Sequence, residues 1–320
     1  MGRRTVFMLM AILALCSCTA RKTAQVVYRS FPKLTVPAMY TTEEDMIEYA
    51  AAHFWDTYFA QSGVTDSAAV LGVRKAELEQ ALSNYIEIQD NLPLAKAQKN
   101  MAELFAKVEA CQQADTSSLF YLRFTEMVER YLYDPNSPMR NEDLFLPFVQ
   151  KLAECPFTDT LMRTGYRYMA RMCSLNQTGS VAPDFTFKDA RGRIHSLHGV
   201  KAGYTMLFFS NPGCDACRQM AEDVDSCPSV SRAIADGRVA LVNIYIDQEI
   251  DKWREYEPSY PRSWITGYDW QFTIRTDQSY DVRAIPSLYL LDSEKRVIMK
   301  DAPTERVLRY LDMKLMQGRQ

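Results

Sequence analysis

The sequence has no cluster of basic residues interleaved with aromatic ones, and its formal net charge is only −3 over 320 residues. A nucleic-acid-binding surface usually shows as such a basic stripe, so we expect no nucleic-acid partner. Beyond residue 15, no apolar stretch approaches the length of about 20 residues that a membrane-spanning helix needs. With 47% hydrophobic and 24% charged residues, the chain has the composition of a folded globular protein.

Residues 41–176 also lack a phosphate-binding loop, a metal-ligand spacing and a catalytic dyad. Apolar residues recur there at helical spacing, and Thr41 with Glu44 has the form of a capping box. The predicted helices begin near residues 41, 78, 101, 119, 141 and 158. The short loops between them favour an up-down helical bundle. His53 is predicted to be a packed or surface histidine rather than a metal ligand or a base.

The N-terminus has the pattern of an export signal that is removed from the mature protein. Arg3 and Arg4 precede an apolar core, Thr5–Leu15, that is too short to span a bilayer. The segment ending at Cys18 resembles a bacterial lipobox, in which a small residue such as Ser17 precedes the lipidated cysteine. An ordinary signal peptide cleaved nearby is the alternative, and either interpretation predicts an exported protein.

Taken together, these patterns divide the chain into four parts. Residues 1–18 are predicted to be a signal peptide with a lipobox-like end, and residues 19–40 a tether of low order. Residues 41–176 form a helical domain. Residues 178–318 alternate strand and helix patterns and form a second domain, because a chain of this length exceeds the size of one typical domain.

The second domain contains a cysteine pair in an informative context. Residues 204–210 are a short apolar, aromatic-rich pattern typical of a buried strand, which residues 211–213 interrupt before a helix pattern resumes. Cys214 is therefore predicted at a helix N-terminus, where the helix dipole and free N–H groups favour a thiolate. Cys217 follows one turn later, within reach of a disulfide. A nucleophilic thiolate with a resolving partner is the minimum for thiol–disulfide exchange.

The flanking motifs extend this observation. Val181-Ala-Pro-Asp-Phe185 leads into a strand pattern, and Ile285-Pro286 precedes another. Over residues 178–318 the chain resembles the thioredoxin superfamily, specifically its periplasmic, membrane-anchored TlpA-like branch. The resemblance implies a central mixed sheet flanked by helices, with Ile285 and Pro286 forming a cis peptide that orients a substrate strand. The alternative is that Pro286 is an ordinary strand boundary.

A second resemblance concerns the helical domain. The segment Tyr49-x-x-x-His53-Phe-Trp55-Asp56 resembles the opening of a helical domain of unassigned function. That domain precedes thioredoxin-like domains in lipoproteins of some Gram-negative bacteria. The resemblance names no activity for these residues.

The motif departs from the thioredoxin pattern at several positions. Gly213 replaces the usual Trp before the first cysteine, and Asp215 lies beside the expected nucleophile. The charge of Asp215 should oppose the thiolate and tune the redox potential. Phe208 occupies the position where many thioredoxins hold a buried acid for proton transfer.

With Phe208 in that position, the proton relay is not identifiable from the sequence. Asp247, His195 and His198 are the candidates. Asp247 also fits a structural role at the end of a strand.

Three other functions remain as alternatives. A peroxiredoxin-like peroxidase would need a P-x-x-x-T/S-x-x-C element, but Leu207 and Asn211 occupy its Pro and Thr/Ser positions. A zinc site would need a second ligand pair beside the two cysteines, which the sequence lacks: the other cysteines are single, and His195 and His198 lie in the strand-turn region before the motif. The third alternative is a redox-inactive binding module on the same fold.

The remaining cysteines and one aromatic segment carry weaker predictions. In an up-down bundle, Cys111 and Cys155 lie at one pole and Cys173 at the other, so 111–155 is the bridge predicted for an oxidising compartment. Cys227 is predicted to be packing, or a third redox cysteine. Residues 251–275 are predicted to be an aromatic-rich insertion that fills space over the sheet or lines a substrate groove.

These observations predict an exported, lipid-anchored thiol–disulfide oxidoreductase without cofactor or metal. Its partners are disulfide-containing protein substrates and a membrane thiol donor, because the periplasm holds no glutathione-type pool. Reduction or isomerisation, rather than net oxidation, is implied by the resemblance alone.

Overall fold

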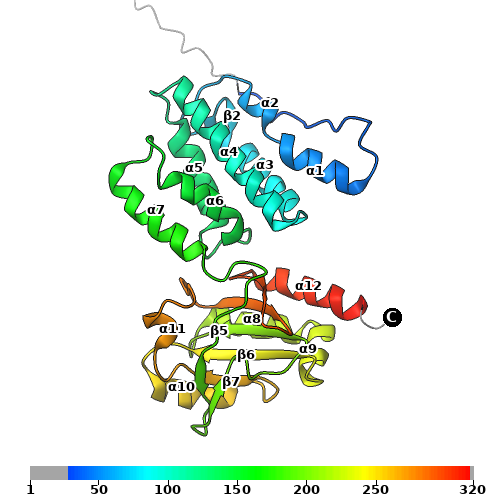
Figure 1. Ribbon diagram of the computed structural model, residues 1–320, viewed down its shortest axis with the longest axis vertical. Coiled ribbons are helices and arrows are strands. Elements are labelled where there is room, and N and C mark those ends of the chain that lie inside the picture. Colours follow the sequence, from blue (N-terminus) through cyan, green and yellow to red (C-terminus); the bar gives the residue numbers. More distant parts are fainter. Residues whose placement is uncertain (1–27, 318–320) are drawn as a thin grey trace, which may run out of the picture.

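The computed structural model describes residues 28–317. Seven helices come first in the chain, and a seven-stranded mixed sheet with its own helices follows. Figure 1 shows the helices α1–α7 in one part of the molecule and the sheet in the other, with α12 beside the boundary. The predicted signal peptide and the lipidation site Cys18 lie outside the described residues. No helix within residues 28–317 combines the length and hydropathy needed to cross a bilayer.

The helical region follows the predicted periodicity, with differences at the element ends. Its elements are α1 (Glu43–His53), α2 (Asp56–Phe59), β1 (Ala69–Val70), β2 (Val73–Arg74), α3 (Lys75–Asp90), α4 (Leu94–Ala114), α5 (Phe120–Leu132), α6 (Glu142–Leu152) and α7 (Thr160–Cys173). The cap of α1 is Thr42, which accepts a hydrogen bond from Asp45 N at 3.1 Å, so the predicted capping box is displaced by one residue. The hairpin β1–β2 was not predicted. Leu71 and Gly72 both have positive φ in its two-residue turn, as the favoured hairpin turns require.

Aromatic side chains form much of the core that these helices share. Trp55, Tyr58 and Phe124 are buried and meet edge-to-face or tilted. Phe31 joins them, with its ring 5.4 Å from Trp55, and Arg29 Nε donates to Leu71 O at 3.0 Å. Arg29 and Phe31 of the predicted tether, residues 19–40, thus contact the core of the helical region.

The bridge predicted between Cys111 and Cys155 is not formed. Cys111, Cys155 and Cys173 are all free. Cys155 Sγ lies 3.8 Å from Glu109 Oε1, and Glu109 precedes Cys111 by two residues on α4. Cys173 is fully buried, and burial raises the pKa of its thiol. These thiols act as small packing side chains.

The sheet region has the strand order β4-β3-β7-β6-β5-β8-β9. Its strands are β3 (Thr186–Lys188), β4 (Ile194–Ser196), β5 (Tyr204–Phe209), β6 (Val239–Tyr245), β7 (Ile265–Tyr268), β8 (Ser287–Asp292) and β9 (Val297–Met299). Its helices are α8 (Asp215–Asp225), α9 (Pro228–Ala235), α10 (Ile250–Tyr256), a short 3-10 turn (Glu257–Ser259), α11 (Thr273–Thr276) and α12 (Thr304–Gln317). Strand β5 pairs parallel with β6 and antiparallel with β8, so the sheet is mixed as predicted.

Both faces of β5 are covered, which explains its continuous apolar sequence. Met206 and Phe208 face a core built with α8, α9 and α12, whereas Leu207 and Phe209 face a core on the other side. The segment 251–275 is not a simple insertion. It contributes β7 to the sheet, between β6 and β3, because Ile265–Tyr268 pairs parallel with β6.

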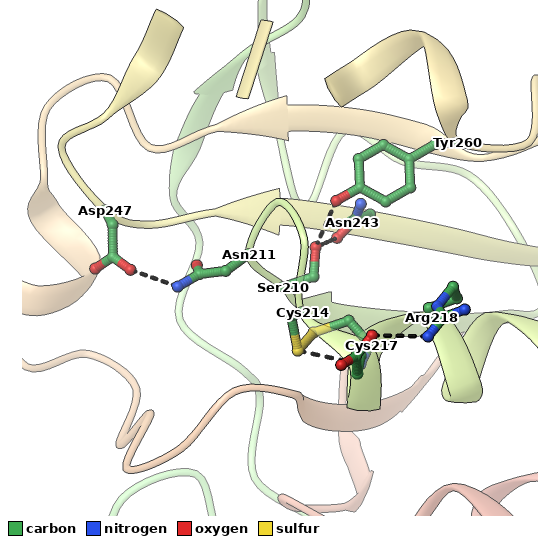
Figure 2. Close-up of a disulfide and its surroundings, with 9 residues drawn as sticks. Ser210, Asn211, Cys214, Cys217, Arg218, Asn243, Asp247 and Tyr260 are labelled. Carbon is green, nitrogen blue, oxygen red and sulfur yellow. Dashed lines mark hydrogen bonds and ion pairs between the residues drawn. A yellow bond between two sulfur atoms is a disulfide. The ribbon is translucent and has the colours of Figure 1, made fainter. Parts of the chain in front are cut away.

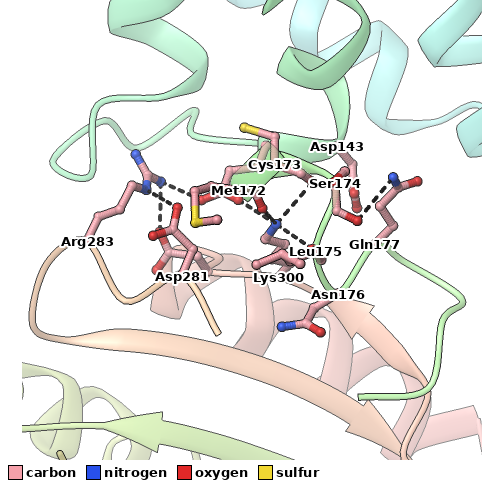
Figure 3. A network of polar contacts seen from close by, with 12 residues as sticks. Asp143, Met172, Cys173, Ser174, Leu175, Asn176, Gln177, Asp281, Arg283 and Lys300 are labelled. Atoms are coloured by element: carbon pink, nitrogen blue, oxygen red, sulfur yellow. Dashed lines mark hydrogen bonds and ion pairs between the residues drawn. The ribbon is translucent and has the colours of Figure 1, made fainter. Parts of the chain in front are cut away.

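Lys300 joins the sheet region to the helical region through buried contacts (Figure 3). Its side chain is 1% exposed, and its Nζ lies 2.6 Å from Glu142 Oε2 at the start of α6. The same Nζ donates to the carbonyl oxygens of Met172, Cys173 and Leu175 at 3.0, 3.1 and 2.6 Å. A cation at the C-terminus of α7 complements the helix dipole as well as the carbonyl oxygens at this end of the helix.

Arg283 makes a second set of contacts across this boundary. Its Nη2 lies 2.8 Å from Glu142 Oε1 and 3.1 Å from Asp301 Oδ2, and its guanidinium carbon lies 3.9 Å from the Tyr133 ring centroid. Burial raises the pKa of nearby Asp281 to about 6. Arg283 precedes Pro286 by three residues, so the helical region contacts the segment that leads into β8.

Candidate functional site

The cysteine pair lies where β5 ends and α8 begins. After Phe209 a short turn ends at Gly213, whose φ of +72° is a conformation that favours glycine. Cys214 is the N-cap of α8, and Cys217 N donates to Cys214 Sγ at 3.1 Å. The two residues form a disulfide with Cα atoms 5.2 Å apart (Figure 2). The predicted position of Cys214 at a helix N-terminus is confirmed.

Burial distinguishes the two sulfurs. Cys214 is half-buried, whereas Cys217 is 5% exposed and belongs to the core beneath α8. An incoming disulfide can therefore approach Cys214 more readily than Cys217. The positive end of the α8 dipole and the N–H of Cys217 both stabilise negative charge on Cys214 Sγ.

Asp215 has a partner that the sequence analysis did not consider. Its side chain is 90% exposed and lies 2.7 Å from Arg218 Nη2, one turn further along α8. The arginine offsets the negative charge of Asp215, and solvent screens both groups. The expected opposition between Asp215 and the Cys214 thiolate is therefore weaker than the sequence alone suggests.

Buried polar groups lie near the position of the missing acid. Phe208 is fully buried and pairs in register with Asn243 of β6. Ser210 Oγ donates to Asn243 Oδ1 at 2.5 Å and lies 3.1 Å from the hydroxyl of Tyr260. Figure 2 shows this cluster beside the turn that carries Cys214. The sequence signal was an asparagine inside the otherwise apolar strand β6, which our sequence analysis missed.

The three candidates for a proton relay are engaged elsewhere. Asp247 Oδ1 pairs with Arg275 at 2.7 Å, and Asp247 Oδ2 accepts from Asn211 Nδ2 at 2.8 Å. Asp247 thus anchors the turn before Cys214 rather than contacting a sulfur. His195 Nε2 lies 3.1 Å from Asp189 Oδ2, and His198 Nε2 donates to the carbonyl oxygen of Ala182 at 2.8 Å.

The peptide bond between Ile285 and Pro286 is cis, as the resemblance predicted. The first residue of β8, Ser287, pairs in register with Phe209, the last residue of β5. The register therefore brings Pro286, the residue before Ser287, to the end of β5, where the turn to Cys214 begins. Ile285 also packs against the core that contains Cys217.

Two remaining predictions concern Cys227 and metal binding. Cys227 is the N-cap of α9, half-buried and free, with its Sγ 3.5 Å from Ser229 Oγ. Within residues 28–317, no group of three or more His, Cys, Asp or Glu side chains is placed to hold a metal ion. His195 and His198 bond to other groups, as described above.

Comparisons with known proteins agree with this architecture. Residues 15–176 match the family model described as DUF5106, a domain of unknown function. A thioredoxin-like protein from Bacteroides caccae ATCC 43185, known from a crystal structure, is 33% identical. It aligns with a TM-score of 0.73 over 89% of this chain and 99% of that chain.

A curated relative adds the same assignment for part of the chain. The thioredoxin-like protein YneN of Bacillus subtilis (strain 168) is 30% identical over 127 residues, which cover 38% of this chain and 69% of that protein. Both this relative and the Bacteroides caccae protein of known structure are named as thioredoxin-like. The chain therefore belongs to the DUF5106 family and to the thioredoxin-like superfamily.

Proposed function

We propose that this protein is a thiol–disulfide oxidoreductase that reduces or isomerises disulfides of exported proteins. One observation carries the proposal. A half-buried Cys214 caps α8 and is bonded to a buried Cys217, next to a cis-proline at the start of the neighbouring strand. A redox-inactive binding module would not need two sulfurs of unequal exposure at a helix N-terminus.

The chemistry proceeds in two exchange steps. In the reduced protein, the Cys214 thiolate attacks one sulfur of a substrate disulfide, forming a mixed disulfide and releasing the first substrate thiolate. Cys217 then loses its proton and attacks Cys214 Sγ, which releases the second substrate thiolate. The substrate gains two electrons and two protons, and the protein is left with the 214–217 disulfide. A membrane thiol donor must then reduce this disulfide.

The cis-proline supplies the docking surface for the first step. Pro286 cannot donate a backbone hydrogen bond, and it lies at the end of β5, where the turn to Cys214 begins. The backbone around Ile285 is therefore available to an extended substrate segment whose sulfur faces Cys214. Ser210, Asn243 and Tyr260 offer buried hydroxyl and amide groups on the same side of β5 as Cys217.

The cellular setting of this activity is part of the proposal. The signal-like residues 1–18 and the lipobox-like Cys18 support a lipid-anchored protein in the periplasm, in the TlpA-like branch. Residues 41–176 would form a separate helical bundle domain and residues 178–318 the redox domain. The helices and the sheet each have their own hydrophobic core, which supports this division.

A trapping experiment tests the proposed roles. Cys217→Ser should accumulate mixed disulfides between Cys214 and substrate proteins, because the resolving step is lost. Cys214→Ser should accumulate none, and Cys227→Ser is the matched control that should turn over normally. Faster alkylation of Cys217 than of Cys214 in the reduced, folded protein would contradict the assignment.

A further inference from the structure

The helical region contains a cavity that the exchange chemistry does not use. It has a volume of about 820 Å³, which lies within the range of about 300–1,000 Å³ typical of ligand sites. Residues of α5 and α7 line it, together with the turn before α7. Among its apolar walls are Leu122, Phe157, Met162 and Met169. Methionine side chains adapt to varied apolar partners.

The helix α7 leaves apolar residues uncovered beside this cavity. It packs mainly against α6, and its outer face carries Leu161, Met162 and Tyr168, which are 88%, 53% and 48% exposed. Leu122 of α5, on the opposite wall, is 48% exposed. Met162 and Leu122 line the cavity, whereas Leu161 and Tyr168 lie on α7 outside its lining. Exposed apolar side chains at a cavity are a feature of interaction sites.

Charge distinguishes the ligands that this cavity can accept. Glu129 lines the cavity, forms no ion pair within residues 28–317, and has the Tyr166 hydroxyl at 3.2 Å as its partner. Burial raises the pKa of Glu129. Arg130 also lines the cavity, but its guanidinium pairs with Glu79. Arg283, on the same lining, is already paired with Glu142 and Asp301. A cationic group from a ligand would complement Glu129.

The cavity adjoins the substrate-docking loop. Arg283 lines it and precedes Pro286 by three residues, so their Cα atoms lie at most about 11 Å apart. The same loop is held by Arg171 at the end of α7, whose Nη2 donates to Gln278 Oε1 at 2.7 Å. A polypeptide of a few residues can therefore extend from the cavity toward Pro286.

We propose that the cavity between α5 and α7 binds a segment of the disulfide-bearing substrate in which a Lys or Arg lies beside apolar side chains. This inference rests on the proposed function, because it assigns the helical region the task of selecting substrates for Cys214. The apolar side chains fill the space between the helices, and the cationic group pairs with Glu129. The substrate cysteine then lies a few residues along the chain, at Pro286.

Binding can be measured without any redox step. The probe is a fluorescein-labelled, cysteine-free peptide, Gly-Ser-Leu-Lys-Phe-Leu-Lys-Ser-Gly, and fluorescence anisotropy reports its affinity for the oxidised protein. The same peptide with both lysines replaced by glutamate should bind about tenfold more weakly or worse, because it places carboxylates against Glu129. Equal affinity for the two peptides would overturn the proposal.

Matched variants locate the site. Met162→Gln removes an apolar contact without adding charge and should weaken the lysine peptide about tenfold, and Glu129→Gln should weaken it measurably less. Met316→Gln makes the same exchange at a methionine of α12 that is 58% exposed, and it should bind as the unsubstituted protein does. Equal losses in Met162→Gln and Met316→Gln would overturn the proposal.

Two other occupants give different results. If the patch faces lipid, Met162→Asp would abolish binding to phosphatidylglycerol vesicles while peptide affinity stays unchanged. If it faces a second copy of the chain, the same variant would convert a dimer to a monomer in sedimentation, again with unchanged peptide affinity. Either result overturns the proposal.

A redox arm separates this inference from the proposed function. Each peptide is extended by a short glycine-serine linker to a disulfide-bonded cysteine, and its reduction by the dithiol protein is followed. The lysine peptide should show the higher kcat/KM, and Met162→Lys, which opposes the peptide's cation, should remove the difference while reduction of a small aromatic disulfide continues. If only Cys214→Ser abolishes reduction of both the peptides and the small aromatic disulfide, the result supports the proposed thiol–disulfide exchange at Cys214. Reduction of the two peptides with equal kcat/KM would overturn the proposed peptide binding in the cavity and leave the proposed redox function in place.

Discussion

Lys300→Met should destabilise the protein strongly, because it removes the cation of a buried ion pair. The Nζ of Lys300 is 2.6 Å from Glu142 Oε2, with side-chain exposures of 1% and 2%. Methionine keeps the apolar stem but leaves Glu142 with Arg283 as its cationic partner. It also leaves three carbonyl oxygens at the end of α7 without this donor.

The expected loss in the free energy of unfolding is the one typical of broken buried ion pairs. Removing one member of a buried ion pair costs about 3–5 kcal/mol when the other charge stays buried without compensation. Because Arg283 still pairs with Glu142, we expect a loss at the lower end of this range, about 3 kcal/mol. Glu142→Gln combined with Lys300→Met should recover part of this loss, since both charges are then absent. The coupling between the two substitutions should be about 0.5–3 kcal/mol.

Urea unfolding followed by tryptophan fluorescence measures these changes. Lys252→Met is the matched control, because Lys252 pairs with Glu249 at 2.6 Å but both side chains are largely exposed. Its urea midpoint should stay at that of the unsubstituted protein. A loss below about 1 kcal/mol in Lys300→Met, the value of a surface pair, would refute the account of this boundary.

Three further predictions concern the redox site and the boundary. Arg218→Ala should lower the thiolate fraction of reduced Cys214 at neutral pH, because it removes a cation and unmasks the charge of Asp215. Asp215→Asn in the same chain should restore the thiolate fraction, which thiolate absorbance measures. Equal thiolate fractions in the single and double variants would count against the Asp215–Arg218 pairing. Burial raises the pKa of Asp281 to about 6, above the value of about 3.9 in the unfolded chain. The folded state therefore binds more protons than the unfolded state, and the contribution of Asp281 to stability falls as pH rises from about 4 to 6. Asp281→Asn should flatten the pH dependence of Tm in that window, and an unchanged slope would show that another group is responsible. Asn243→Leu should slow the step in which Cys217 releases substrate from the mixed disulfide, while the alkylation rate of Cys214 is unchanged. The reason is that Asn243 and Ser210 form the polar cluster on the Cys217 side of β5. Equal release rates in Asn243→Leu and the unsubstituted protein would remove this cluster from the mechanism.

The position of the cysteine pair was predictable because its signals are local. A buried-strand pattern, a break and a helix pattern place Cys214 at an N-cap without any long-range information. Pro286 was recognised through its resemblance to a family motif, and the pairing of Ser287 with Phe209 places it at the end of β5, which leads to the cysteines. Both features depend on short segments of sequence.

The missed features depend on residues that are far apart in the chain. Glu142, Arg283 and Lys300 meet at the boundary, and nothing in their sequence neighbourhoods distinguishes them from surface charges. Strand β7 was missed because its four residues lie among aromatic residues and form a strand only by pairing with β6. The bridge between Cys111 and Cys155 was wrongly predicted, because an up-down arrangement fixes which pole a residue occupies but not where its side chain points.

The reduction potential of the Cys214–Cys217 pair tests the central claim most directly. The oxidised protein is equilibrated with defined dithiothreitol or glutathione redox buffers, and the thiols are alkylated and counted by mass spectrometry. A reductant or isomerase should show a reversible two-electron transition between about −180 and −270 mV, the range of disulfide isomerases and thioredoxins. A potential below about −300 mV, typical of structural disulfides, would contradict the proposed exchange activity.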